Sequence, residues 1–174
     1  MIEIFTDGAC NPNPGQGGWS FVAYENGVEI HNASGSVNDT TNNVMEMTGV
    51  LNALVWARLV IQENANVLIK SDSAYVVKGC NIWRHRWAKN NWRGKINLKN
   101  ADLWKAIAAA HDAFPCKITW VKGHAGIAGN ERADDLADSA MVAFDHKNLD
   151  TTVSGYNSKL DDQFRAIFGS EEPQ

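Results

Sequence analysis

Residues Trp19–Ser36 read WSFVAYENGVEIHNASGS, two apolar runs separated by a short polar turn. The turn contains Asn26-Gly27, a pair that favours the tight reversal joining two antiparallel strands. The segment therefore predicts a β-hairpin. An apolar run at residues 2–6 precedes it and predicts a buried strand that a turn at Asp7-Gly8 ends. The sheet is thus expected to begin with three antiparallel strands.

Helical and strand patterns alternate after this hairpin. Thr40-Thr41-Asn42-Asn43 supplies N-cap candidates for a long helix, in which apolar residues recur at helical spacing. The predicted elements are a helix at about Val44–Glu63, a strand at Val67–Ser71, helical segments at about 74–79 and 82–90, a helix at Ala101–Ala113, a strand at Ile118–Val121 and a helix at Asn130–Ala143, with loops at 11–18 and 123–129. This order predicts an α/β fold, with a mixed five-stranded sheet of antiparallel then parallel strands flanked by helices.

Composition and length indicate a globular protein with one main domain. The chain has 174 residues, of which 44% are hydrophobic and 21% charged, values typical of globular proteins. The apolar pattern fades after about Asp145. We expect a domain at residues 1–144 and a polar, partly disordered extension at 145–174, with a short helix at about Leu160–Phe168.

Three features favour a cytoplasmic location. No apolar run approaches the roughly 20 residues of a membrane span, and the N-terminus does not resemble a signal peptide. The cysteines are odd in number, far apart and outside any C-x-x-C pair, namely Cys10, Cys80 and Cys116. They are expected to be reduced thiols without metal.

The net charge of −4 hides one strongly basic segment. Residues 78–99 hold seven Lys and Arg and no acidic residue, whereas the remaining chain has nine basic and all twenty acidic residues. Trp83, Trp87 and Trp92 lie in the same segment. A basic, aromatic segment in an acidic protein indicates an anionic partner bound at one place.

Acidic residues follow two strands that are predicted to be neighbours. Asp7 and Asp72 each follow a strand; taken singly each is typical of a turn, but ligands bind beyond the carboxyl ends of such strands. Glu46 lies near the start of the long helix, where it could simply favour the helix dipole. The residues alone leave a fourth acid open among Glu131, Asp134, Asp135 and Asp138.

Carboxylates that converge in one cleft repel one another unless cations neutralise them. Oxygen ligands without Cys or His clusters indicate Mg²⁺ or Mn²⁺, and two such ions support in-line displacement at phosphorus. His124, in a Gly-rich loop, could move a proton beside such a site, although a loop histidine is often only solvated.

Six motifs together resemble ribonuclease H type 1, the bacterial single-domain kind, over about residues 2–143. They are Phe5-Thr6-Asp7-Gly8, Asn13-Pro14-Gly15, Thr40-Thr41-Asn42-Asn43 with Met45-Glu46, Ser71-Asp72-Ser73 with Tyr75, Trp120–Gly126, and Asn130–Asp134 with Leu136-Ala137. The resemblance implies the ribonuclease H fold, with residues of about 80–99 as a basic protrusion. It also implies hydrolysis of the RNA strand of RNA·DNA hybrids, leaving 5′-phosphate and 3′-hydroxyl ends.

The resemblance also assigns the site. It implies that Asp7, Glu46, Asp72 and Asp134 bind Mg²⁺, with Mn²⁺ as a substitute and two ions present with substrate, and that His124 is catalytic. The substrate contacts that it implies are Cys10, Asn13, Thr41, Asn42 and Asn43 for the RNA strand, and Trp83, Trp87, Lys89, Trp92, Arg93 and Lys95 for the DNA strand. Trp83 is expected to be mostly core. A monomer without membrane contact is implied, acting in the removal of RNA primers and R-loops.

Two departures and two alternatives stand beside this interpretation. Ala74 occupies a position that is often Gln in bacterial relatives, and Asn11-Pro12 replaces a more glycine-like segment. A DNA nuclease or integrase-like enzyme would reuse the acidic cluster on the same sheet. A hybrid-binding module without catalysis is the other alternative, although retention of all four acids and His124 disfavours it.

Overall fold

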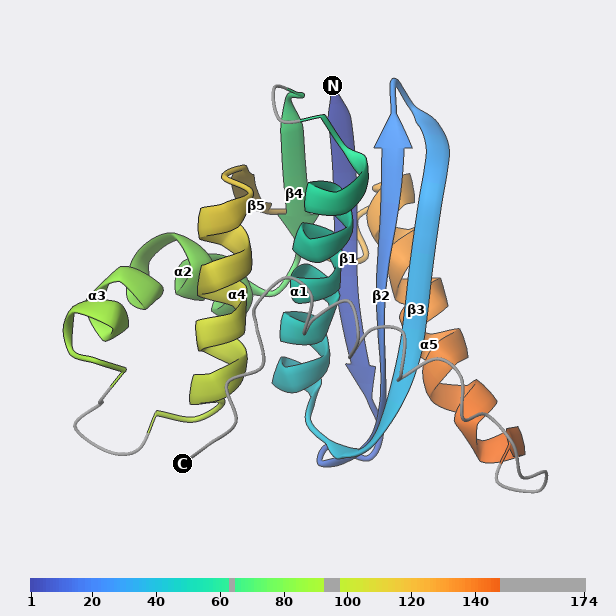
Figure 1. Ribbon diagram of the computed structural model, residues 1–174. Helices are drawn as coiled ribbons and strands as arrows, with labels where there is room; N and C mark the ends of the chain where they lie inside the picture. The colour runs from blue at the N-terminus through green and yellow to red at the C-terminus, as the bar shows by residue number, and fades with distance from the viewer. Residues whose placement is uncertain (63–64, 93–97, 148–174) are drawn as a thin grey trace. The chain divides into compact units, whose positions relative to one another are not determined.

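Five strands form one mixed sheet in the order β3-β2-β1-β4-β5 (Figure 1). The structure is a computed structural model, and it describes residues 1–62, 65–92 and 98–147. In chain order the elements are β1 (Ile2–Cys10), β2 (Gly15–Glu25), β3 (Val28–Thr40), α1 (Asn42–Val60), β4 (Val67–Ser71), α2 (Ala74–Lys78), the π-helix η1 (Gly79–Trp83), α3 (Arg84–Lys89), α4 (Ala101–Ala113), β5 (Lys117–Trp120) and α5 (Ala128–Lys147). The predicted fold class is confirmed.

The chain divides into two compact units, Met1–Phe144 and Asp145–Gln174. The sheet and the helices from α1 to α4 belong to the first unit. The predicted short helix at about Leu160–Phe168 lies outside the described residues. Within the described part of the chain, no helix has the length and apolar character that crossing a membrane requires.

The predicted hairpin is confirmed at its turn. β2 and β3 pair antiparallel up to Glu25↔Val28, which leaves only Asn26 and Gly27 between the strands. Both turn residues have positive φ, 52° and 82°, as the favoured two-residue hairpin turn requires. The other ends of the two strands extend further than expected, because pairing continues to Gly15↔Thr40 and shortens the predicted loop at 11–18.

The predicted turn at Asp7-Gly8 is wrong, since β1 continues through both residues to Cys10. On one side β1 pairs with β4 in parallel, and this pairing ends at Thr6↔Ser71. On the other side the antiparallel ladder with β2 runs on to Cys10↔Gly17. The longer partner strand therefore keeps β1 extended, while Asp7 still lies where the parallel pairing ends.

The long helices lie close to their predicted positions. Thr41 is the N-cap of α1 and accepts a hydrogen bond from Val44 N at 3.4 Å. This helix ends at Val60, three residues before the expected Glu63. The bounds of α4 are those predicted, and α5 begins two residues earlier than expected, at Ala128.

The helices cover both faces of the sheet (Figure 1). α1 lies across β1 and β2 and packs against α4, whereas α5 lies on the opposite face. On the α1 side, a Cβ at Gly8 would overlap the main chain of Met45 and Glu46. On the α5 side, Ser20 Oγ donates a hydrogen bond of 2.6 Å to Ala133 O. These close contacts bring α1 and α5 to the end of β1 that carries Asp7.

Candidate active site

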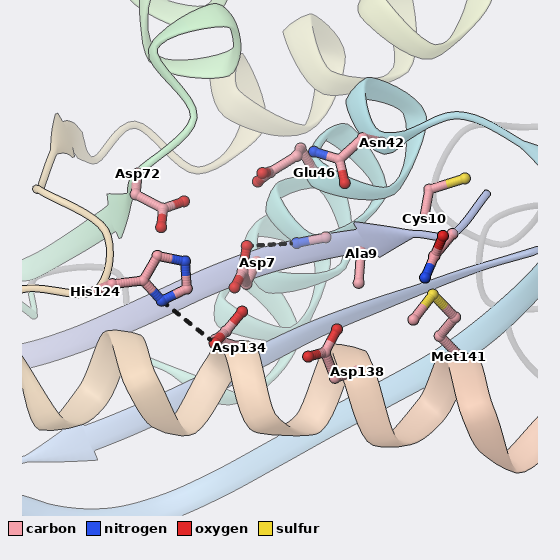
Figure 2. Close-up of a pocket in the computed structure, with 12 residues that line it drawn as sticks. Asp7, Ala9, Cys10, Asn42, Glu46, Asp72, His124, Asp134, Asp138 and Met141 are labelled. Carbon is pink, nitrogen blue, oxygen red and sulfur yellow. Dashed lines mark hydrogen bonds and ion pairs between the residues drawn. The ribbon is translucent and has the colours of Figure 1, made fainter. Parts of the chain in front are cut away.

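Asp7 and Asp72 occupy equivalent places on two neighbouring parallel strands. They follow the last parallel pair, Thr6↔Ser71, so their side chains start from the same edge of the ladder. Asp7 is only 6% exposed, and its Oδ1 accepts a hydrogen bond from Gly8 N at 2.8 Å. The predicted juxtaposition of the two acids is present in the structure (Figure 2).

Glu46 reaches the same point from α1. The close approach of α1 to β1 at Gly8 places this buried glutamate, 6% exposed, beside Asp7. One ligand oxygen from each of Asp7, Glu46 and Asp72 lies within 4.8 Å of the others. Glu46 Oε2 is buried and has no hydrogen-bond partner among the described residues. Three converging carboxylates with an unpartnered buried oxygen fit a divalent cation.

The electrostatics of the acids also indicate that this site requires a cation. Burial, followed by the charge of Asp72, raises the pKa of Asp7 from 3.8 to about 8. Burial, followed by the charges of Asp7 and Asp72, also raises the pKa of Glu46 well above its usual value. Both carboxylates therefore lack a compensating positive charge, which a bound metal would supply.

Asp134 and His124 complete the predicted acidic site from the α5 side. Asp134 lies in the second turn of α5, and its charge contributes to the raised pKa of Asp7. His124 Nδ1 lies 3.7 Å from Asp134 Oδ2, and the histidine side chain is 80% exposed. The histidine has a φ of 49°, and the following loop is held where Gly126 N donates to Glu131 Oε1 at 2.9 Å. All five predicted catalytic residues therefore face one pocket.

Two residues that hold Asp72 were missed as site residues. Asn130, only 1% exposed, donates a hydrogen bond from Nδ2 to Asp72 Oδ2 at 3.1 Å. Trp120 donates from Nε1 to the main-chain oxygen of Asp72 at 2.9 Å. Both residues lie within motifs of the ribonuclease H resemblance, but no role was predicted for either. A polar Asn one turn before Asp134, in a helix with an apolar face, was the available signal.

The pocket around the acids has a volume of about 420 Å³. Figure 2 shows its residues coming from β1, α1, the turn after β4, the His124 loop and α5. The described residues that line it are Asp7, Gly8, Ala9, Cys10, Asn11, Asn42, Glu46, Asp72, His124, Asp134, Asp138 and Met141. Of the predicted RNA contacts, this set includes Cys10 and Asn42.

Two of the remaining predicted RNA contacts, Asn13 and Thr41, have structural partners at the start of α1. Asn13 Oδ1 accepts a hydrogen bond of 3.2 Å from Asn42 N at the start of α1. Thr41 caps the same helix, whereas Asn43 is exposed. Cys10 Sγ is directed at Pro12 O and Thr40 O, at 3.3 and 3.5 Å. These contacts hold the loop after β1 against the α1 N-terminus.

The two helical segments predicted at about 74–79 and 82–90 form one continuous helical segment, α2-η1-α3, which leads into the predicted protrusion. A π-turn at Gly79–Trp83 joins the two α-helical parts. Trp83 and Trp87 are 5.8 Å apart between ring centroids, and Trp87 lies 5.2 Å from the buried Trp104. Both indoles are half-buried, so Trp83 takes part in aromatic packing but keeps part of its surface exposed.

The basic residues of the protrusion differ in burial. Arg84 is buried, and it bonds Cys80 O at 2.7 Å and Asp112 Oδ1 at 2.6 Å. This guanidinium therefore holds the fold together and is not available to a partner. Lys89 is exposed at the end of α3, and Trp92 follows it half-buried. The predicted contacts Arg93 and Lys95 lie outside the described residues.

Comparison with known proteins agrees with this geometry. The family model described as RNase H matches residues 1–142. The chain is 44% identical to the ribonuclease H of Bartonella quintana, over 83% of this chain and 91% of that protein. It is 42% identical to the ribonuclease HI of Neisseria meningitidis, over 82% and 97%. The crystal structure of LC9-RNase H1, a type 1 RNase H with the type 2 active-site motif, has a TM-score of 0.72 and 29% identity, covering 82% of this chain and 72% of that one. With its acidic site on this sheet, the chain belongs to the ribonuclease H family and is an enzyme of that family.

Proposed function

We propose that this protein is an endonuclease that hydrolyses the RNA strand of RNA·DNA hybrids, without sequence specificity, leaving 5′-phosphate and 3′-hydroxyl ends. The observation that carries the proposal is the convergence of Asp7, Glu46 and Asp72 to within 4.8 Å, with Glu46 Oε2 unpartnered. Such a cluster is unfavourable without cations and suits phosphate chemistry once they are bound.

The acids would hold two Mg²⁺ ions when substrate is present, and Mn²⁺ would substitute. Asp7, Glu46 and Asp72 would hold one ion, and Asp7 with Asp134 the other. When bound, such ions activate a water molecule and stabilise the leaving oxygen of an in-line displacement. Asn130 and Trp120 keep Asp72 in place, because they bond its carboxylate and its main-chain oxygen respectively.

His124 would assist proton movement during hydrolysis, or product release. Its ring is largely exposed and lies 3.7 Å from Asp134, close to the acids but not packed among them. An imidazole can accept a proton at one ring nitrogen and donate one from the other, which suits proton movement. The flanking glycines, Gly123 and Gly126, leave the loop free of bulky side chains that would fix the ring.

The substrate would lie across the pocket and towards the protrusion. Cys10 and Asn42 line the pocket, with Asn13, Thr41 and Asn43 beside them, where polar groups could contact 2′-hydroxyls of the RNA strand. Trp87, Trp92 and Lys89 would contact the DNA strand, with Arg93 and Lys95 adding positive charge from outside the described residues. Phosphate attraction of this kind is independent of sequence and sensitive to salt.

We further propose that residues 1–144 act as a monomeric catalytic domain with residues 145–174 as an appendage. Free Cys10, Cys80 and Cys116 fit a reducing compartment such as the cytoplasm. Removal of RNA primers and of R-loops would be the matching cellular tasks, since both present RNA·DNA hybrids.

Cleavage of an end-labelled RNA·DNA hybrid with Mg²⁺ tests the proposal. We expect cutting of the RNA strand alone and loss of cutting in EDTA, with RNA·RNA and DNA·DNA duplexes as matched controls. Cutting of duplex DNA at the same rate would favour the integrase-like alternative. Binding of the hybrid without turnover in either Mg²⁺ or Mn²⁺ would favour the binding module.

A further inference from the structure

A fifth acid, Asp138, lines the active-site pocket from α5. Asp134 and Asp138 are four residues apart, so they occupy the same face of the helix on successive turns. Figure 2 shows both carboxylates directed from α5 towards β1, with Asp138 opposite Ala9. Asp135, which carries the same side chain and is also exposed, is not among the residues that line the pocket.

In the part of the chain that is described, no Lys or Arg pairs with Asp138, and the basic group that acts on its charge is His124 in the same pocket. No ion pair involves this residue among the described side chains, and the described lining of the pocket contains neither Lys nor Arg. The same pocket holds the buried, unpartnered Oε2 of Glu46, which independently indicates a cation there. Asp138 therefore adds negative charge to a site that already lacks compensation.

Asp138 is placed to act on a cation through water. The residue is exposed, and it is not one of the acids whose ligand atoms converge to within 4.8 Å. A carboxylate about one helical turn from a hydrated divalent ion still attracts it, and this attraction weakens as salt screens the two charges. The attraction favours the Asp134 side of the pocket, because Asp138 lies one turn from that residue.

We propose that Asp138 is a positioning residue that attracts hydrated Mg²⁺ or Mn²⁺ to the Asp134 side of the active site and so lowers the metal concentration that the enzyme needs. This inference rests on the proposed function for its use of the metal. It adds to the four acids a residue that does not itself ligate the ion or touch the substrate.

The test compares Asp138→Asn with Asp135→Asn in the full-length chain. Both variants remove one exposed charge from the same helix, but only Asp138 faces the pocket. Mn²⁺ binding without substrate, measured by isothermal titration calorimetry at low salt, should weaken about two- to fivefold in D138N. In D135N it should change less than 1.5-fold, and the difference between the variants should shrink in about 0.5 M salt.

Hybrid cleavage across an Mg²⁺ titration gives the second readout. D138N should need about two- to fivefold more Mg²⁺ for half-maximal rate and reach the wild-type rate at saturation. Equal Mn²⁺ affinity in D138N and D135N would overturn the inference, as would a rate at saturating Mg²⁺ reduced more than tenfold in D138N. Wild-type protein that binds Mn²⁺ but cuts no hybrid would instead overturn the proposed function, while the calorimetry still decides the role of Asp138.

Discussion

Asn130 Nδ2 donates a hydrogen bond of 3.1 Å to Asp72 Oδ2, and this amide joins the first turn of α5 to the end of β4. The two residues lie 58 positions apart in the chain. The amide is almost completely buried, so its hydrogen bond is not exchanged with bulk water. One oxygen of this candidate metal ligand is thereby fixed in direction.

Asn130→Ala should lower hybrid cleavage about 10- to 100-fold and weaken Mn²⁺ binding, because Asp72 loses the donor that orients it. Steady-state cleavage and calorimetry with Mn²⁺ measure the two effects. Asn32→Ala is the matched control, since this exposed asparagine bonds only Glu29 among the described residues. Wild-type metal affinity in N130A would show that Asp72 does not need this hydrogen bond.

Asp7→Asn should reduce hybrid cleavage by at least about 10³-fold while the fold is retained. Asp7 is the acid that lies between Asp72, Glu46 and Asp134, and an amide neither carries its charge nor binds a cation as strongly. Single-turnover cleavage measures the rate, and circular dichroism of the variant checks that the fold is retained. An undiminished rate in D7N would remove Asp7 from the mechanism.

The stability of the metal-free enzyme should fall as the pH rises from about 5 to 7.5. Burial raises the pKa of Asp7 to about 8 in the folded chain, against 3.8 when unfolded. Between these values the folded state binds the proton and the unfolded state does not, so the free energy of unfolding decreases with pH. We expect a loss of about 2–3 kcal/mol over this range in urea denaturation with EDTA.

Two additions separate this pH effect from other titrations. Asp7→Asn cannot ionise, so it should show a smaller loss over the same range. Saturating Mn²⁺ should also reduce the loss, because a bound cation favours the ionised acids. Stability that rises with pH in the EDTA-treated wild type would mean that these acids are not held protonated.

The sequence was sufficient where local chemistry decides the structure. Asn26-Gly27 set the hairpin turn, and the apolar runs before Asp7 and Asp72 marked the two strands whose parallel pairing ends just before these acids. The sequence did not predict two features that depend on contacts between residues far apart in the chain. The antiparallel pairing with Gly17 carries β1 past its expected end, and the role of Asn130 depends on a residue 58 positions away.

The sequence also did not predict which Lys and Arg residues of the basic segment are buried. Nothing in the sequence distinguishes Arg84 from Lys89, yet the first is buried against α4 and the second is exposed. The difference arises because Arg84 faces Asp112 and the carbonyl of Ala108 across the helix pair. Only the packing of α3 against α4 reveals it.

This difference predicts opposite effects for the two substitutions. Arg84→Ala should lower the free energy of unfolding by about 1–3 kcal/mol, because Cys80 O and Ala108 O lose their buried donor. Lys89→Ala should leave stability within about 0.5 kcal/mol and instead raise the KM for the hybrid, with a weaker dependence on salt. Urea denaturation and cleavage at two salt concentrations separate the outcomes. A destabilised K89A, or an R84A that changes only the KM, would reverse these assignments and place Arg84 on the substrate.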